Sequence, residues 1–205
     1  MPFIDPLERF AQTLATTGVD QGLIGPREVE RLWDRHILNC VVVVDPVSGL
    51  VPPNSRVADV GSGAGLPGLV WAIARPDLRV TLVEPLLRRS SFLTQTVEAL
   101  GLHPRVEVIR ARAEDLLNDS TRGTFDMSTA RAVAPLARLL DWTVPFLRPS
   151  GTLIALKGQS ASVEVAQARE EIARHRLASC EVEVLRAAYI VDPTTVVVAK
   201  AGAAE

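Results

Sequence analysis

The stretch VADVGSGAGLPG, residues 57–68, largely decides how the rest of the chain is interpreted. It begins as a short apolar run typical of a buried strand, passes through glycines at every second position, and leads into an apolar segment typical of a helix. Glycine allows positive φ and leaves room for a ligand against the main chain. A strand, a glycine-rich turn and a helix in this order predict a ligand site at the carboxyl end of the first strand of an α/β sheet.

Alternating strands and helices follow this motif. Strands are predicted at 56–60, 79–84, 106–110, 125–130 and 152–157, with helices at 66–74, 88–100, 136–146 and 163–177 and a short turn at 114–117. Short, continuously apolar strands that alternate with helices favour a parallel, doubly wound sheet.

The last two predicted strands, 181–187 and 194–200, are joined by a link too short for a crossover helix, so they must pair antiparallel. A mostly parallel sheet of seven strands with a C-terminal antiparallel hairpin is the methyltransferase variant of the Rossmann-like α/β fold. Dehydrogenase sheets normally finish parallel.

Two segments precede the sheet. Residues 1–45 are predicted to form an N-terminal helical extension, with helices at 7–17 and 26–43, and residues 45–55 are rich in proline and glycine, as a linker is. Residues 56–205 are predicted to form one ligand-binding domain.

Composition limits the class of protein. With 205 residues and 47% hydrophobic content the chain can bury a sizeable core. We expect a cytoplasmic protein because no long apolar run or leader is found, and we expect a monomer. The cysteines Cys40 and Cys180 lie far apart and histidines are few, so no disulfide or metal site is expected. The net charge of −2 argues against nucleic-acid binding by overall charge alone, although a local basic face is compatible with it.

The glycine loop is compatible with two cofactors. Its last glycines fit G-x-G-x-x-G, so the loop alone does not separate NAD from S-adenosylmethionine. Asp59 is placed to meet a cationic amino group, which a methionine moiety has, while Gly61 and Gly63 would lie against the ligand. Glu84 ends the second strand, where an acidic side chain accepts ribose hydroxyls. We expect S-adenosylmethionine; a dinucleotide-dependent oxidoreductase is the alternative, disfavoured by the hairpin and by the lack of a second domain.

The residues after the fourth strand restrict the chemistry. Residues 129–132, Thr-Ala-Arg-Ala, lack the polar-Pro-Pro-aromatic pattern of exocyclic amine methylation, and neither cysteine is positioned as a nucleophile. Ring nitrogens such as guanine N7 remain, and these need no general base because the lone pair carries no proton. Arg131 and Lys157, at the ends of the fourth and fifth strands, are the candidates for catalysis and for donors to the substrate.

Other arginines could contact RNA. In addition to Arg131 and Lys157, the candidates are Arg35, in a series with Arg27 and Arg31, and Arg88 with its neighbour Arg89. Each could instead be a solvated surface residue, and a methyltransferase of small molecules is the closest alternative because near-neutral charge is no obstacle there. His36 is expected to be a core histidine.

Taken together, these residues resemble the RsmG (GidB) family of bacterial methyltransferases of guanine N7 in 16S ribosomal RNA. The resemblance covers about residues 33–200, and its motifs are WDRHI at 33–37, DVGSGAGLPG at 59–68, RAED at 112–115, TARAVAPL at 129–136 and ALKG at 155–158. It implies that S-adenosylmethionine is lined by Gly61, Leu66, Ala113, Glu114 and Arg131, with Glu84 at the ribose, and that ribosomal RNA or the small ribosomal subunit is the partner. Asn39-Cys40 departs from the Asp-Ser common in the family.

Overall fold

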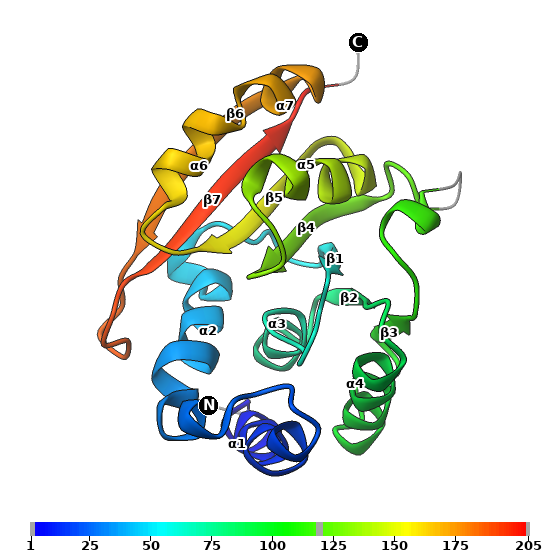
Figure 1. Ribbon diagram of the computed structural model, residues 1–205, viewed down its shortest axis with the longest axis vertical. Helices are drawn as coiled ribbons and strands as arrows, with labels where there is room; N and C mark the ends of the chain where they lie inside the picture. The colour runs from blue at the N-terminus through cyan, green and yellow to red at the C-terminus, as the bar shows by residue number, and fades with distance from the viewer. Residues whose placement is uncertain (1–2, 118–120, 204–205) are drawn as a thin grey trace.

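The computed structural model describes residues 3–117 and 121–203, which build a seven-stranded sheet (Figure 1). Its strand order is β3-β2-β1-β4-β5-β7-β6. The strands are β1 (Arg56–Val60), β2 (Arg79–Val83), β3 (Val106–Ile109), β4 (Phe125–Arg131), β5 (Leu147–Lys157), β6 (Leu177–Leu185) and β7 (Thr194–Ala201). The first five run parallel, and β7 runs antiparallel to both β5 and β6. The predicted fold class is confirmed.

The chain reverses its direction of travel across the sheet at β1. Strands β2 and β3 lie on one side of β1, and β4 lies on the other. Loops that leave the carboxyl ends of β1 and β4 therefore diverge and open a crevice between them, which is where open α/β sheets bind ligands.

Helices cover both faces of the sheet (Figure 1). One layer contains α1 (Ile4–Thr13), α2 (Leu38–Val44), α3 (Gly68–Ala74) and α4 (Leu87–Ala99), and the other contains α5 (Leu136–Thr143), α6 (Ala161–Gln167) and α7 (Arg169–Arg174). Large buried side chains such as Phe10, Trp71 and Phe92 fill the first layer. Leu140, Leu153 and Val197 belong to the core of the second.

The N-terminal extension shares the core of the sheet. Phe10 and Leu14 are fully buried, and the indole Nε1 of Trp71 on α3 donates to the main-chain oxygen of Cys40 on α2 at 3.1 Å. Burial of this apolar surface supplies most of the binding energy between extension and sheet. The extension is therefore held rigidly enough to contribute side chains to a site.

Helices were predicted in the right places within the extension, but they are not uniform. A π-helical turn, η1 (Leu14–Gly18), continues α1, and the second segment passes from a 3-10 turn, η2 (Pro26–Arg31), through a π-helical turn, η3 (Trp33–Ile37), into α2. The linker adds a 3-10 turn, η4 (Pro46–Ser48), capped by Asp45. Such irregular turns are frequent where a helix adapts to partners outside it.

The prediction was wrong at residues 163–177, where a single helix was expected. Helix α6 begins earlier, at Ala161, the chain breaks at Ala168, and α7 ends at Arg174. Arg176 then takes a φ of +49°, and β6 starts at Leu177 rather than at 181 because Leu177 pairs with Ala201 of β7. Pairing with a distant strand, rather than local propensity, decides this boundary.

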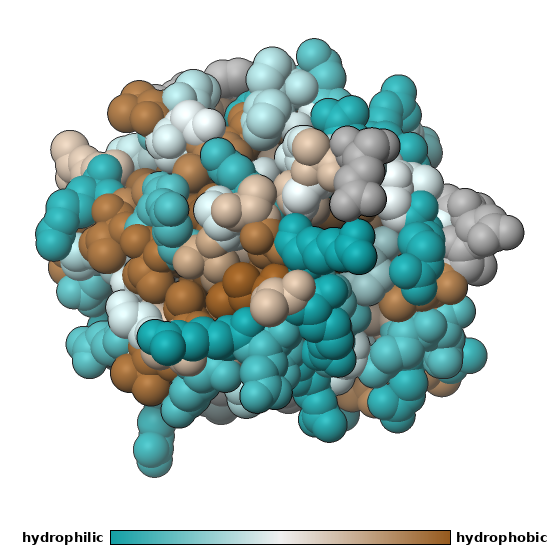
Figure 2. All heavy atoms as spheres, turned by 90° about the horizontal axis from the view of Figure 1, so that it is seen from above, coloured by the Kyte–Doolittle hydropathy of each residue, from teal (hydrophilic) through white to brown (hydrophobic). Residues whose placement is uncertain are grey.

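Apolar and polar side chains both contribute to the molecular surface that Figure 2 shows, which is the top of the molecule as oriented in Figure 1. Figure 2 shows apolar side chains gathered across the middle of this face with polar ones around them. None of the helices in the described residues is long and apolar enough to cross a membrane.

Candidate functional site

A cavity of about 820 Å³ opens at the carboxyl ends of β1, β2 and β4. Its wall combines the glycine loop with the loops after β2, β3 and β4 and with three residues of the extension, Leu23, Ile24 and His36. This volume is in the range of cavities that enclose a cofactor. The sequence prediction of a ligand site at this edge of the sheet therefore corresponds to a real cavity.

Gly61 and Gly63 form the floor of this cavity, at the turn after β1. Both have positive φ, +73° and +56°. A Cβ on Gly61 would lie 2.8 Å from a methyl carbon of Val133, whereas a Cβ on Gly63 would meet nothing closer than 3.8 Å. The first glycine is needed for close packing and the second leaves backbone exposed to a ligand.

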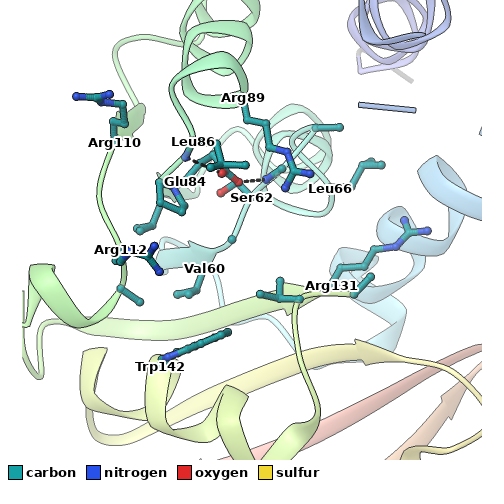
Figure 3. A pocket seen from close by; sticks show the side chains of 18 of the residues that line it. Val60, Ser62, Leu66, Glu84, Leu86, Arg89, Arg110, Arg112, Arg131 and Trp142 are labelled. Atoms are coloured by element: carbon teal, nitrogen blue, oxygen red, sulfur yellow. Dashed lines mark hydrogen bonds between the residues drawn. The ribbon is translucent and has the colours of Figure 1, made fainter. Parts of the chain in front are cut away.

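Glu84 lies directly after β2 and is almost fully buried, yet it borders the cavity (Figure 3). Its Oε2 accepts from the main-chain N–H of Gly63 at 3.0 Å, and its Oε1 accepts from the N–H of Leu86 at 3.0 Å. These two bonds hold the carboxylate at the cavity wall. Each oxygen has a further lone pair with which it can accept a hydroxyl.

Asp59 has a different environment from the predicted one, because it does not line the cavity. It is fully buried behind the glycine loop, where its Oδ2 accepts from the N–H of Gly68 at 3.1 Å and its Oδ1 is unpaired. Burial raises the pKa of Asp59 to about 7, and the charge of Glu84 acts in the same direction. The side chain braces the loop from behind, since β1 points it toward α3 rather than toward the crevice.

The loop after β3 supplies the opposite wall. Ala113 is buried, Glu114 begins the 3-10 turn η5 (Glu114–Leu116), and both border the cavity, as does Leu66 of the glycine loop. Figure 3 shows Arg112 directed toward the cavity and Arg110 directed away from it.

Arg131 borders the cavity, but its guanidinium turns toward the extension (Figure 3). It donates to the main-chain oxygens of Arg35 at 2.9 Å and His36 at 3.2 Å, to Nδ1 of His36 at 2.6 Å, and to Sγ of Cys40 at 3.5 Å. The guanidinium that the sequence predicted to be available for a ligand is thus hydrogen-bonded to residues of the π-helical turn η3.

His36 is the intermediate member of a chain of polar contacts, not a core histidine as predicted. Its Nδ1 accepts from Arg131, so Nε2 carries the proton and donates to Oε2 of Glu28 at 2.9 Å. Burial lowers the pKa of His36, and the charge of Arg131 lowers it further. The hydrogen bond from His36 in turn lowers the pKa of Glu28.

A second cavity, of about 870 Å³, lies on the other side of Arg131. The two cavities share His36, Arg131, Ala132 and Val133. Donor and acceptor side chains line the second cavity from several elements, namely Glu28, Arg35, Asn39, Lys157, Glu164, Gln167 and Asp192. Two ligands, one in each cavity, would come into contact next to the short loop after β4.

Lys157 is engaged in this second cavity and is not free to act alone. Its Nζ donates to Oε2 of Glu164 at 2.7 Å and to the main-chain oxygen of Ala134 at 2.7 Å. The same Oε2 accepts from the N–H of Leu136, at the start of α5. Although burial raises the pKa of Glu164, these hydrogen bonds outweigh it and the pKa is lowered. The pair fixes the loop between β4 and α5.

Two of the predicted RNA-contacting arginines differ in surroundings. Arg35 is half exposed at the second cavity, where its Nη1 lies 3.5 Å from Oε2 of Glu28. Arg88 is outside both cavities, since its Nη2 donates to the main-chain oxygen of Asp20. Its neighbour Arg89 borders the first cavity instead and points toward it (Figure 3), because one residue along a helix rotates the side chain by about 100°.

Sequence reasoning missed several residues of the first cavity. Leu23 and Ile24 come from a loop of the extension, and Trp142 comes from the last turn of α5. Nothing in their local sequence distinguishes them from core residues. The only available signal was the pair of glycines at 22 and 25, which predicted a loop beside Leu23.

Comparison with known proteins agrees with this geometry. A family model described as rRNA small subunit methyltransferase G (GidB) matches residues 4–191. Relatives named ribosomal RNA small subunit methyltransferase G include one from Mycolicibacterium vanbaalenii, 48% identical over 204 residues, covering 100% of this chain and 87% of the relative. Another, from a Nocardioides species, is 54% identical over 190 residues, covering 93% and 73%.

Solved structures share the fold at low identity. M. jannaschii TYW2 in complex with AdoMet has a TM-score of 0.59 and 17% identity, covering 81% of this chain and 77% of that one. A SAM-dependent O-methyltransferase from Thermotoga maritima has a TM-score of 0.58 and 14% identity, covering 87% and 71%. The fold, the cavity and the sequence match over most of the chain lead to one conclusion: the chain belongs to the GidB family, rRNA small subunit methyltransferase G.

Proposed function

We propose that this protein transfers the methyl group of S-adenosylmethionine to N7 of a guanine in small-subunit ribosomal RNA. The observation that carries the proposal is the pair of adjoining cavities, which share Arg131, Ala132 and Val133. Methyl transfer needs a cofactor and an acceptor in contact but in separate compartments. The short loop after β4 is where they would meet.

The first cavity fits S-adenosylmethionine. Glu84 offers two fixed carboxylate oxygens to a ribose diol at the end of β2, and the exposed backbone at Gly63 suits the methionine part. Ala113, Glu114 and Leu66 surround the space that remains for the adenine. When bound, the cofactor supplies an electrophilic methyl group on a sulfonium.

Positioning is the task that remains for the protein. N7 of guanine has an outward lone pair and no proton, so no residue has to act as a general base. Holding the acceptor about 3–3.5 Å from the methyl carbon, in line with the departing sulfur, accounts for most of the rate. The ion pair between Lys157 and Glu164 supports a positioning role for the protein, because its hydrogen bonds fix the loop between the cavities.

The second cavity suits a polar base rather than an apolar molecule. Asn39, Gln167 and Arg35 offer donors and acceptors that could meet the edges of a purine. A base inside a duplex could not enter it, so the acceptor has to be unstacked or lie in a single-stranded loop. Of the residues predicted to contact RNA, Arg35 has the most exposed guanidinium at this cavity.

The test is methyl transfer from radiolabelled S-adenosylmethionine to purified small-subunit ribosomal RNA and, in parallel, to small ribosomal subunits. Borohydride reduction followed by aniline then cleaves RNA at N7-methylguanine, because the methylated imidazole ring is positively charged. We expect label in RNA and a single cleavage site. Label without cleavage would exclude N7, and no label in either substrate would exclude the ribosomal reaction.

A matched pair of variants tests the cofactor site. Glu84→Gln removes one charged acceptor and should weaken S-adenosylmethionine binding at least about tenfold, the value of a charge-assisted hydrogen bond. Glu98→Gln makes the same change at an exposed position of α4 and should leave binding unaltered. Calorimetric titration of the two variants measures the difference.

A further inference from the structure

Three neighbouring parallel strands have an arginine at their first residue or directly before it. Arg56 is the first residue of β1, Arg79 is the first residue of β2, and Arg105 directly precedes β3. Arg56 of β1 pairs with Arg79 of β2. Val80 of β2 pairs with Val106 of β3, so Arg79 and Arg105, each one residue earlier in the chain, are also adjacent. We call this set the arginine row. It lies at the amino ends of the strands, opposite the cofactor crevice.

The arginine row lines a hollow of its own. A cavity of about 250 Å³ is bordered by the three arginines together with His103, Thr81 and Glu107. This face of β2 and β3 is poorly covered, because the described part of the connection from β3 to β4 contains only the 3-10 turn η5. Glu107 is exposed and Thr81 is half buried.

The carboxylates at this edge form their ion pairs with other arginines. Asp77 forms two hydrogen bonds with Arg75, each 2.8 Å long, and Asp126 forms an ion pair with Arg148 at 2.8 Å. Asp77 also acts on Arg105 through its charge, and Asp126 accepts from the main-chain N–H of Arg56 at 2.6 Å. Glu107 is the remaining acid that borders the hollow, and within the described residues it forms no ion pair. The arginine row therefore keeps its charge.

Each guanidinium of the row has donors available. Within residues 3–117 and 121–203, the Arg79 side chain forms no hydrogen bond or ion pair. Arg56 lies over the ring of Phe125, 5.3 Å from its centroid, and Arg105 uses Nη1 to donate to the main-chain oxygen of Ala72. A guanidinium has five N–H donors, so most of them remain free.

Like charges on adjacent strands repel and destabilise a sheet unless an anion lies between them. We propose that the arginine row binds backbone phosphates of the RNA substrate, as a second contact remote from the methyl-transfer site. This inference rests on the proposed function, since it requires RNA as substrate. A guanidinium fork matches phosphate oxygens, and a chain with net charge −2 needs such local sites to hold RNA.

The length of strand β1 gives the distance between the arginine row and the cofactor crevice. Arg56 in the row and Val60 at the crevice are the first and last residues of β1, so their main chains lie about 13 Å apart. An RNA that reaches both must pass around the β3 edge of the sheet. Folded ribosomal RNA can do so, whereas a single nucleotide cannot.

The experiment compares Arg56→Gln/Arg79→Gln with Arg169→Gln/Arg186→Gln. The control pair removes the same charge at two exposed arginines that border neither the hollow of the arginine row nor the two cavities of the site. Binding of full-length small-subunit ribosomal RNA is measured by filter retention from about 50 to 200 mM salt. Methyl transfer to the same RNA is measured in parallel.

For the arginine-row variant we expect the slope of log affinity against log salt to fall by roughly 1.5, since each lost phosphate contact removes about 0.7–0.9. The KM for RNA should rise on the order of tenfold with kcat nearly unchanged. Arg56→Lys/Arg79→Lys should retain the slope, which separates charge from any effect on folding.

The two hypotheses fail in different ways. If the wild-type protein methylates RNA but the arginine-row and control variants have the same salt slope and KM, the row contacts no phosphate and the inference is wrong. If the wild-type protein methylates no RNA, the proposed function is wrong. Loss of kcat with unchanged KM would also contradict the inference, because a remote phosphate contact acts on binding.

Discussion

The guanidinium of Arg131, at the end of β4, donates a hydrogen bond to Nδ1 of His36, 2.6 Å away in the N-terminal extension. This contact joins two segments that are 95 residues apart in the chain. It also forms part of the wall between the two cavities. The extension is thereby a component of the site and not an appendage to it.

His36 should make the stability of the protein sensitive to acid. Its pKa is lowered by burial and by Arg131, so the folded state binds the proton less readily than the unfolded state does. Stability is then fully present above the unfolded pKa of about 6.5 and is lost as the pH falls through the lower folded value. His36→Gln, which keeps one acceptor and one donor, should flatten this dependence in urea unfolding between pH 7.5 and pH 5.

His175→Gln is the control for this prediction. On the far side of the sheet, His175 contacts Oδ1 of Asp141 at 2.7 Å, and the guanidinium of Arg174 donates to the same oxygen at 2.7 Å. This variant should keep the acid sensitivity of the wild-type protein. If the free energy of unfolding depends on pH equally in His36→Gln and in the wild type, protonation of His36 does not reduce stability and the prediction is wrong.

Asp59 should have the opposite effect on stability. Its pKa is about 7 in the folded state because of burial, well above the ordinary value of 3.8, so the folded state binds the proton more tightly. Stability therefore decreases as the pH rises from about 4 to 7 and levels off above that, with a ceiling of about 4 kcal/mol. In Asp59→Asn this loss should be absent.

Chemical denaturation at several pH values measures the Asp59 effect. Asp34→Asn, an exposed acid of the extension, serves as the comparison and should retain the wild-type profile. The difference between each variant and the wild type separates Asp59 from His36, whose contributions have opposite signs. If the stability of Asp59→Asn changes with pH as that of the wild type does, the buried carboxylate is ionised over the whole pH range.

Gly61 should tolerate no side chain. Gly61→Ala places a Cβ 2.8 Å from Val133 and requires φ of +73°, whereas Gly49→Ala requires a similar φ of +66° but meets nothing within 4 Å. We expect about 1 kcal/mol of destabilisation at Gly49 from backbone strain alone. Overlap with Val133 should add roughly 1–3 kcal/mol at Gly61.

Binding of S-adenosylmethionine distinguishes these two glycine variants further. Gly61→Ala should lose most of its affinity, because Val133 moves at the junction of both cavities, and Gly49→Ala should keep the affinity of the wild type. Isothermal titration of the folded variants gives the answer. Similar affinities would indicate that the loop shifts without disturbing the cavity.

Glu164 should stabilise the loop after β4 through Lys157. Glu164→Gln leaves the amine of Lys157, only 9% exposed, without its counter-charge, and we expect a loss of about 2–3 kcal/mol, below the range for fully buried pairs. Lys157→Met/Glu164→Gln should recover part of this loss, since no unpaired charge remains. Thermal unfolding of both, with Glu170→Gln on α7 as the exposed control, tests the pairing.

The sequence by itself determined the architecture and the position of the site. Residues 57–68 define the first strand, the glycine turn and the helix that follows, because glycine content and apolar runs act on the backbone locally. The short link before residue 194 made the last strand antiparallel for a purely geometric reason. Glu84 could be located because the end of a parallel strand is a predictable place.

Tertiary structure alone decided what the polar side chains do. Arg131, Lys157 and Asp59 were each predicted to face a ligand, and in the folded chain each is hydrogen-bonded to another part of the protein, namely His36, Glu164 and Gly68. Their partners lie between 7 and 95 residues away, and which charges meet depends on how separate elements pack rather than on local pattern. A charged side chain is satisfied by whichever partner the packed fold brings within hydrogen-bonding distance, and no periodicity in the chain encodes that distance.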